Sequence, residues 1–231
     1  MAFGIARGAR LSGFSVGAEQ ERLLQADGVL DAPEELVALA AAAGYAPAFQ
    51  PTGGYPGLRA ALPNAYIEAI VDVLVGPIAE AFGLGAARPA RAQGAFSLVT
   101  LAPEALAPPQ RAPHVDSVDP MQFAILHYLC DRSAGGTAFY RHRATGFETI
   151  DRNRRARYEA ARAAEPAPEG YVADGAPWFE QIAHVEAAVN RLIVYRSCLL
   201  HSGTVPDPTM LSSDPRRGRL TANIFLTLMP A

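Results

Sequence analysis

The chain has 231 residues, of which half are hydrophobic and 19% are charged, and its formal net charge is -3. This balance is typical of a folded globular protein and excludes a disordered chain, and the length favours a single domain, 1–231, with a full core. The charges are scattered, so no broad basic surface is predicted for nucleic acid or for an anionic membrane.

Residues 1–17 lack the apolar core of a secretion signal, and no apolar run approaches the length that spans a bilayer. We therefore expect a cytoplasmic protein with no membrane partner. Cys130 and Cys198 lie in apolar, strand-like runs, which favours reduced core thiols over a disulfide. All 20 basic residues are arginine, so any anion held by a cationic side chain must be held by a guanidinium group.

The first 93 residues predict a helical N-terminal part. Asp31-Ala-Pro-Glu-Glu is typical of a helix start, with Asp31 as the cap, and this helix is expected to end before Gly44. Asn64 is expected to cap a second, longer helix that reaches about Phe82. Between the two helices, residues 45–63 are rich in Gly and Pro, which predicts an ordered loop or a lid rather than a regular element.

From residue 94 onward the chain changes to short runs of β-branched and aromatic residues, which predict strands. The expected strands cover residues 95–101, 112–116, 121–130, 136–141, 191–200 and 218–228. A helical insert at about 151–187 lies between them, and its first half is a strongly charged helix, Asp151 to Ala164. The arginines of this helix predict a solvated face, with a substrate-facing role as the alternative.

The run Ala-Pro-His114-Val-Asp116 carries the first candidate chemistry. Side chains two apart on an extended strand project to the same side, so His114 and Asp116 should converge while Val115 turns away. An imidazole and a carboxylate on one face are half of a first-row metal site, and a second imidazole from a distant strand would complete a facial triad with three open positions. His201, at the end of a predicted strand, is the candidate.

The order of these pieces resembles the iron(II)/2-oxoglutarate dioxygenase superfamily, especially its prolyl-hydroxylase-like branch and, more loosely, a bacterial family of unassigned function within it. The matching pieces, over about residues 94–228, are His114-Val-Asp116, Ile125-Leu-His-Tyr128-Leu, Gly135-Gly136-Thr, the strand that leads to His201, and the strand after Gly218. The resemblance implies an α+β, mainly β fold, with a double-stranded β-helix (jelly roll) core of residues 94–228 and supporting N-terminal helices. It also implies Fe(II) bound by His114, Asp116 and His201, with 2-oxoglutarate and O2 as cosubstrates.

A cation is needed for the distal carboxylate of 2-oxoglutarate. Arg219, Thr221 and Asn223 share one face of the last predicted strand, and a guanidinium group can clamp a carboxylate while Thr221 adds a hydrogen bond. Tyr128 matches the strand tyrosine of the family that reaches the same carboxylate. The 18 positions between His201 and Arg219 exceed the usual spacing of the family. Either the loop between them bulges outward, or Arg216 or Arg217 takes this role.

Other polar residues are weaker candidates for the substrate side of the site. Gln122 is expected on the face that points into the pocket, and His142 and Trp178 could line a substrate mouth; a surface histidine and a packed core aromatic are the alternatives for these two. His127 should point away from the site as an ordinary hydrogen-bonded histidine. His184 lies in a helical-looking segment and is expected to be structural or exposed.

The predicted activity is hydroxylation of a small molecule or amino-acid-like substrate, with release of succinate and CO2. Asp116 argues against a halogenase, because members of that type resemble this pattern with a small residue in place of the carboxylate. Two alternatives stay open: a cupin-like metal-dependent isomerase or hydrolase with the same three ligands, and a non-catalytic binding module on the same barrel. The segment 45–63 and the arginine-rich insert are the expected lids, and an arginine-lined mouth would suit an acidic small molecule. The pattern does not predict the substrate or the oligomeric state.

Overall fold

The computed structural model of the protein describes residues 3–6, 8–50, 53–166, 168–172 and 177–231. A larger sheet contains β1 (Arg10–Val16), β2 (Glu21–Asp27), β3 (Ala46–Gln50), β4 (Gly53–Ala61), β5 (Ala87–Val99), β6 (Gln122–Tyr128), β9 (Arg191–Arg196) and β11 (Arg219–Pro230). A smaller sheet contains β7 (Gly136–His142), β8 (Phe179–Glu186) and β10 (His201–Thr204). The helices are α1 (Pro33–Ala42), α2 (Asn64–Ala81) and α3 (Arg152–Ala163).

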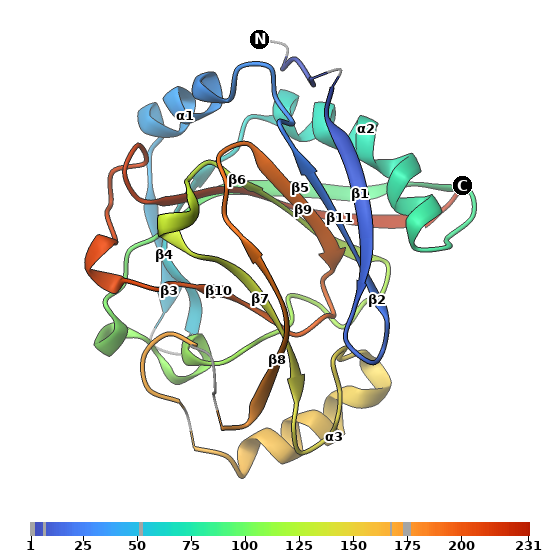
Figure 1. The fold of residues 1–231 in the computed structure, drawn as a ribbon, viewed down its shortest axis with the longest axis vertical. Coiled ribbons are helices and arrows are strands. Elements are labelled where there is room, and N and C mark those ends of the chain that lie inside the picture. The colour runs from blue at the N-terminus through green and yellow to red at the C-terminus, as the bar shows by residue number, and fades with distance from the viewer. Residues whose placement is uncertain (1–2, 7, 51–52, 167, 173–176) are drawn as a thin grey trace.

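Every strand pairing among the described residues is antiparallel. The order is β1-β2-β9-β6-β11-β5-β4-β3 in the larger sheet and β10-β7-β8 in the smaller one. Figure 1 shows α1 and α2 at one end of the molecule and α3 at the opposite end. The fold is therefore mainly β with N-terminal helices, as the sequence predicts.

The larger sheet has two different faces, and β11 shows the difference. Leu220, Ala222 and Ile224 belong to the core cluster that also contains Leu36 of α1 and Ile70 of α2, so this face is covered by the two helices. The alternate residues of β11 face the smaller sheet across a second cluster. The two cysteines are buried and unpaired, in agreement with the prediction of reduced thiols.

The two N-terminal helices lie close to their predicted positions but begin differently. The residue before α1 is Ala32, which makes no side-chain cap, so the assignment of Asp31 as the cap is wrong by one residue. Pro63 precedes α2, and Asn64 is the first helical residue instead of the cap. Packing against the sheet stabilises both helices in place of side-chain caps. No helix in the described part of the chain is both long and apolar enough to cross a bilayer.

The predicted helical N-terminal part is only partly helical, because residues 10–61 also supply four strands. β1 and β2 form a hairpin that pairs with β9, and β3 and β4 form another that pairs with β5. The second hairpin occupies most of segment 45–63; residues 51–52 lie outside the described part. A Cβ on Gly57 would lie 2.0 Å from the carbonyl oxygen of Leu98, so glycine permits the close approach of β4 to β5.

The insert is half helix and half strand. Asp151 caps α3 by accepting hydrogen bonds from the backbone of Asn153 and Arg154, which agrees with the predicted helix. Its arginines form ion pairs, such as Arg154 with Glu19, which agrees with a solvated face. The second half is not helical, since it forms β8 and pairs with β7. His184 lies on this strand and is exposed, as expected, although its segment is not a helix.

Candidate metal centre

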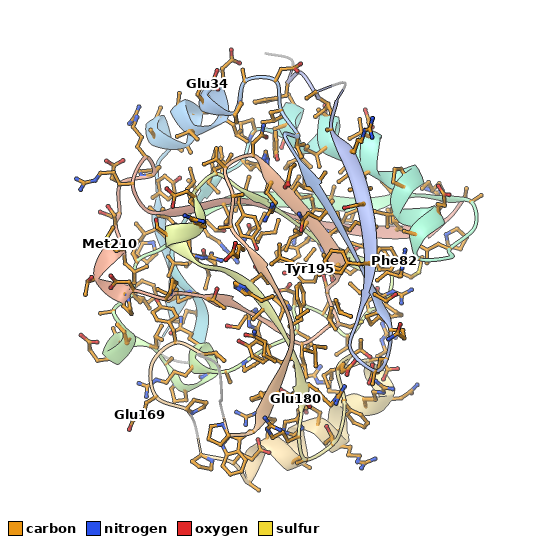
Figure 2. The ribbon with its side chains drawn as sticks, in the orientation of Figure 1. Glu34, Phe82, Glu169, Glu180, Tyr195 and Met210 are labelled. Atoms are coloured by element: carbon orange, nitrogen blue, oxygen red, sulfur yellow. The ribbon has the colours of Figure 1, made fainter. Side chains whose placement is uncertain are left out.

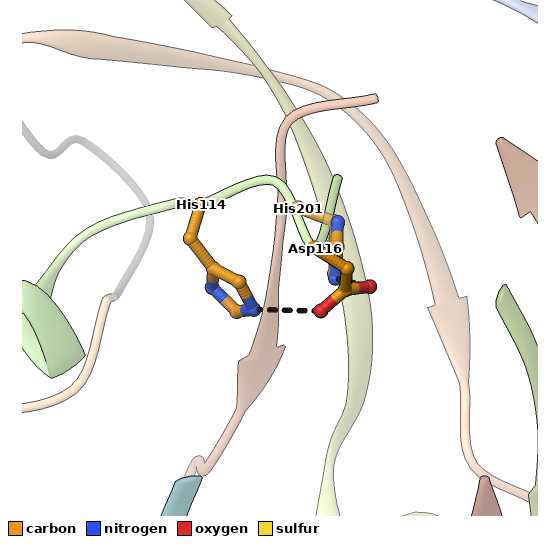
Figure 3. A group of neighbouring side chains, drawn as sticks. All are labelled: His114, Asp116 and His201. Carbon is orange, nitrogen blue, oxygen red and sulfur yellow. Dashed lines mark ion pairs between the residues drawn. The ribbon is translucent and has the colours of Figure 1, made fainter. Parts of the chain in front are cut away.

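The structure brings the three predicted ligand side chains together on the inner side of the smaller sheet. One ligand atom from each of His114, Asp116 and His201 lies within 4.8 Å of the other two. Nε2 of His114 is 3.7 Å from Oδ1 of Asp116, and Nε2 of His201 is 3.3 Å from Oδ2 of the same carboxylate (Figure 3). Two imidazole nitrogens and one carboxylate oxygen match the donor set of the facial triad that binds Fe(II) and leaves open positions.

Backbone hydrogen bonds set this geometry. His114 N donates to His201 O at 2.9 Å, and His201 N donates to His114 O at 3.0 Å, so the chain around His114 extends the smaller sheet beyond β10. Asp116 N donates to the carbonyl oxygen of Ser197 at 2.9 Å. The main chain therefore holds all three ligands in place, and alternation along the extended segment turns His114 and Asp116 to one side.

A hydrogen bond to the main chain orients the imidazole of His201. Its Nδ1 donates to the carbonyl oxygen of Leu199 at 2.8 Å, which leaves the lone pair on Nε2, the nitrogen that faces Asp116. His201 is buried, whereas 53% of the His114 side chain is exposed. The centre is thus anchored on its inner side and open on its outer side.

The three groups attract positive charge. Burial alone lowers the pKa of His201, but the Asp116 carboxylate outweighs it and raises that pKa above its ordinary value. Burial likewise favours a protonated Asp116, yet the two imidazoles hold its pKa well below the usual range. A carboxylate that stays ionised between two imidazoles is suited to bind a divalent cation.

A cavity of about 420 Å³ adjoins the three ligands. Its apolar lining includes Val99, Ala124, Leu126 and Phe225. Its polar lining beyond the ligands includes Tyr55, Arg59, Gln110, Thr137, Tyr171, Tyr195, Arg219 and Asn223. An apolar cavity of this size with a few polar groups is typical of a small-molecule site.

Arg219 lines the cavity from β11 and is 5% exposed. One terminal nitrogen donates to the carbonyl oxygen of Gly136 at 2.6 Å, whereas Nε is buried and has no hydrogen-bond partner. Arg216 and Arg217 are exposed on the loop that precedes β11. This part of the loop thus lies at the surface, which accounts for the long spacing after His201, and Arg219 is the arginine of the three that lines the cavity.

Tyr128 and Thr221 lie on the inner face but are not among the lining residues. The pairing register aligns Arg59, Ser97, Thr221 and Tyr128 in one row across four neighbouring strands. The hydroxyl of Tyr128 donates to Oγ1 of Thr137 at 2.6 Å, and Thr137 does line the cavity. The structure therefore connects Tyr128 to the cavity through Thr137.

The three weaker candidates are not among the lining residues. Gln122 lies on the inner face, one alternation step beyond Ala124, which lines the cavity. His142 is buried on the other face of β7, where it contacts Glu165 and its ring lies tilted against that of Phe179, with 5.3 Å between centroids. Trp178 packs against a third hydrophobic cluster, which contains Phe179 and Tyr140, and its indole donates to the carbonyl oxygen of Pro166. His127 points away from the site and hydrogen-bonds in the core, as expected.

Sequence reasoning missed four tyrosine and arginine residues of the lining. Tyr55 and Arg59 lie on β4, within the segment predicted as a loop or lid. Tyr195 is 2% exposed and shares a face of β9 with Ile193, which alternation along this strand could have shown; Figure 2 places it near the middle of the molecule. Tyr171 lies outside the helices and strands, so no hydrophobic periodicity could have predicted its position.

Comparisons with known proteins place the chain in a family and identify its fold. The model of a family described as a family of unknown function (DUF6445) matches residues 7–226. No curated protein matches the sequence. The solved structure of the non-heme alpha ketoglutarate dependent epimerase SnoN from nogalamycin biosynthesis has a TM-score of 0.52 and 15% identity, over 92% of this chain and 79% of that chain. SnoN in complex with Fe3+, alpha ketoglutarate and nogalamycin RO gives 0.53 and 16%, over 92% and 80%. At this identity the likeness shows a shared fold alone.

Proposed function

The chain belongs to the DUF6445 family of unknown function, and from its metal centre we propose that it is an Fe(II)- and 2-oxoglutarate-dependent oxygenase with a double-stranded β-helix core. The observation that carries the proposal is the convergence of His114, Asp116 and His201 beside a cavity that contains the buried guanidinium group of Arg219. The fold likeness to SnoN, whose structure contains Fe3+ and alpha ketoglutarate, supports it.

The residues present fit both groups. Two imidazole nitrogens and one carboxylate oxygen would hold Fe(II) and leave positions for a chelating keto acid. The unpartnered Nε of Arg219 is a donor suited to the distal carboxylate of 2-oxoglutarate. When bound, Fe(II) and 2-oxoglutarate supply the oxidation of a substrate by O2, with release of succinate and CO2.

The surrounding residues would position and shield these groups. The bond from His201 to Leu199 fixes the nitrogen that faces the metal. Tyr128 orients Thr137 toward the cavity, and Thr221 lies beside Tyr128 in the neighbouring strand. Apolar side chains such as Val99 and Leu126 reduce the access of water to the reacting centre.

Hydroxylation of a small molecule is the outcome we propose, as in the prolyl-hydroxylase-like branch that the sequence resembles. The likeness to an epimerase makes inversion of a stereocentre the second candidate. The mass of the product distinguishes them, because hydroxylation adds an oxygen atom and epimerisation leaves the composition unchanged. A metal-dependent isomerase or hydrolase of the cupin type would turn over without 2-oxoglutarate.

An anaerobic titration tests the proposal. Fe(II) followed by 2-oxoglutarate should give the visible charge-transfer absorption of the chelated metal in the wild-type protein. Asp116→Ala should abolish this absorption, and Arg219→Gln should require about tenfold to a hundredfold more 2-oxoglutarate, because it removes a charge-assisted pair. Arg216→Gln, an exposed arginine of the neighbouring loop, is the matched control. A folded wild-type protein that binds Fe(II) but gives no such absorption would refute the proposal.

A further inference from the structure

The cavity contains a second guanidinium group, that of Arg59 on β4. Arg59 lies opposite Ser97 of β5, which in turn pairs with Thr221 of β11. Its cross-strand row is therefore displaced by one alternation step from the row of Arg219. From the strand spacing, two inter-strand steps and one two-residue step separate the two arginine Cα atoms by about 12 Å.

Arg59 makes no hydrogen bond or ion pair with any residue that the structure describes. Its Nε is buried and has no acceptor among the described residues, and its guanidinium carbon lies over the ring of Tyr55, 4.8 Å from the centroid. The other cavity arginine differs, since Arg219 donates to Gly136. Arg59 as a whole is half-buried, so the cost of desolvation falls on its buried Nε, and an anion is the ligand that removes it.

The charges of the cavity indicate that neither the protein nor the cosubstrate supplies this anion. Asp116 is the one acidic side chain among the described residues of the lining. With the metal and the dianionic cosubstrate in place, the formal charges of Fe(II), Asp116, 2-oxoglutarate and Arg219 cancel. The charge of Arg59 then has no counterpart in the described part of the cavity. Tyr55 lies close to both cations: its burial raises its pKa, and Arg219 and Arg59 oppose that rise.

We propose that Arg59 is the substrate-binding cation of this enzyme and that the substrate is a small molecule with a carboxylate, which pairs with this guanidinium group. A planar guanidinium group satisfies a carboxylate with two parallel hydrogen bonds, whereas a phosphate dianion would require further donors. Gln110 offers at most one more donor, because its oxygen accepts from Ala107 N and one of its two N–H groups donates to the carbonyl oxygen of Gly54. Tyr55, stacked on Arg59, and Tyr171 offer aromatic surface to the rest of such a molecule.

This inference deepens the proposed function and rests on it, because Arg219 is assigned to the cosubstrate. Arg59 takes the place of the arginines of α3 as the group expected to bind an acidic substrate. The arginines of α3 are not among the lining residues, and Arg154, Arg155 and Arg162 are already paired with acids. The specificity comes instead from a residue in the segment that the sequence predicted as a loop or lid.

The test measures anion binding to the anaerobic Fe(II) and 2-oxoglutarate complex. The probes are acetate, benzoate and phenylacetate, each compared with its neutral amide, and binding is followed by calorimetry and by the change in the charge-transfer absorption. We expect at least one carboxylate to bind the wild type and its amide to bind at least about tenfold more weakly. Arg59→Gln should weaken that carboxylate by about tenfold to a hundredfold and Arg59→Lys by less, while Arg216→Gln should have no effect.

The affinity for 2-oxoglutarate distinguishes the role of Arg59 from that of Arg219. Arg59→Gln should retain the wild-type affinity for 2-oxoglutarate and the wild-type melting temperature, whereas Arg219→Gln should lose affinity for 2-oxoglutarate. If Arg59→Gln loses that affinity, Arg59 belongs to the cosubstrate site and the inference is overturned, although the proposed function stands. Carboxylate binding that does not depend on Arg59, or tighter binding of phenyl phosphate, overturns it as well. If the wild type binds no 2-oxoglutarate but still binds carboxylates through Arg59, the proposed function fails and the anion site remains.

Discussion

His114 and His201 exchange both of their backbone hydrogen bonds, at 2.9 and 3.0 Å, and their rings lie 4.6 Å apart between centroids. The separation of two candidate metal ligands that are distant in the sequence is thus set by the main chain of one β-bridge. Asp116 is two residues from the first of them and is attached to Ser197 in the same way. Such a site is preorganised, because little chain has to be ordered when a cation binds.

Replacing Asp116 by alanine should remove most of the metal affinity. The substitution deletes the one negative charge among the three ligands, and we expect the affinity for Fe(II) to fall by at least about a hundredfold, since the loss of an outer partner alone costs tenfold to a hundredfold. Anaerobic calorimetry measures this change. His184→Ala, at an exposed histidine on β8, is the control and should bind the metal as the wild type does. Equal affinities of Asp116→Ala and the wild type would exclude the three residues as the metal centre.

Tyr128→Phe tests the contact between the row of polar residues and the cavity. It removes the hydrogen bond to Thr137 from a fully buried position, so we expect a loss of about 1 kcal/mol in the free energy of unfolding. Because Thr137 then loses its orientation, the affinity for 2-oxoglutarate should fall while Fe(II) binding is retained. Denaturant unfolding and the charge-transfer titration measure the two effects. A variant that loses stability but binds 2-oxoglutarate with unchanged affinity would show that Tyr128 contributes to stability and not to cosubstrate binding.

His127 should make the stability of the protein depend on pH in the acidic range. Burial lowers the pKa of His127 from its ordinary value of 6.5 to about 4, and the hydrogen bond with Asn190 only partly opposes this change. Between these two values the unfolded chain takes up a proton that the folded protein excludes. The stabilising contribution is therefore complete above pH 6.5 and is lost as the pH falls toward 4, by an amount of up to about 3 kcal/mol.

Urea unfolding of His127→Gln between these two pH values measures the contribution. The variant should lose stability at neutral pH, because it leaves the partner Tyr66 poorly matched, but its stability should fall less steeply with decreasing pH than that of the wild type. His184→Gln, at an exposed position, should follow the wild-type slope. Parallel pH profiles for the wild type and His127→Gln would contradict the assignment of a buried neutral imidazole.

Gly57→Ala tests the close approach of β4 and β5. The new Cβ would lie 2.0 Å from the Leu98 oxygen and 2.8 Å from the Thr100 nitrogen, so the strands must separate. We expect a loss of about 1–3 kcal/mol in the free energy of unfolding. Carboxylate binding should weaken as well, because Tyr55 and Arg59 lie on the same strand.

Gly76→Ala is the control for Gly57→Ala and should cost much less stability. Gly76 lies inside α2, and its added Cβ meets nothing within 4 Å. Alanine is a better helix former than glycine, but Pro77 follows directly and disfavours the helical conformation of a preceding residue with a Cβ, so this variant should stay within about 0.5–1 kcal/mol of the wild type. Thermal unfolding of both variants measures the difference, and a Gly57→Ala protein as stable as the wild type would show that the two strands separate at no cost.

The sequence alone determined the features that depend on local spacing. A two-residue step on an extended chain turns His114 and Asp116 to one side, and the same step separates the polar and apolar faces of β11. The sequence likewise predicted the second helix close to its observed bounds, Asn64–Ala81. These patterns need no knowledge of the rest of the fold, because neighbouring residues alone produce them.

Tertiary structure alone decided which elements the remaining segments form and which residues reach the cavity. The hairpin of β3 and β4 carries the glycines and prolines of a loop, and it is a strand pair because β5 supplies its hydrogen-bond partners and Gly57 admits the close contact. β8 is likewise a strand because β7 lies beside it. Arg59 joins the cavity only through this long-range pairing. No local pattern can report it, since its neighbours in space are distant in the chain.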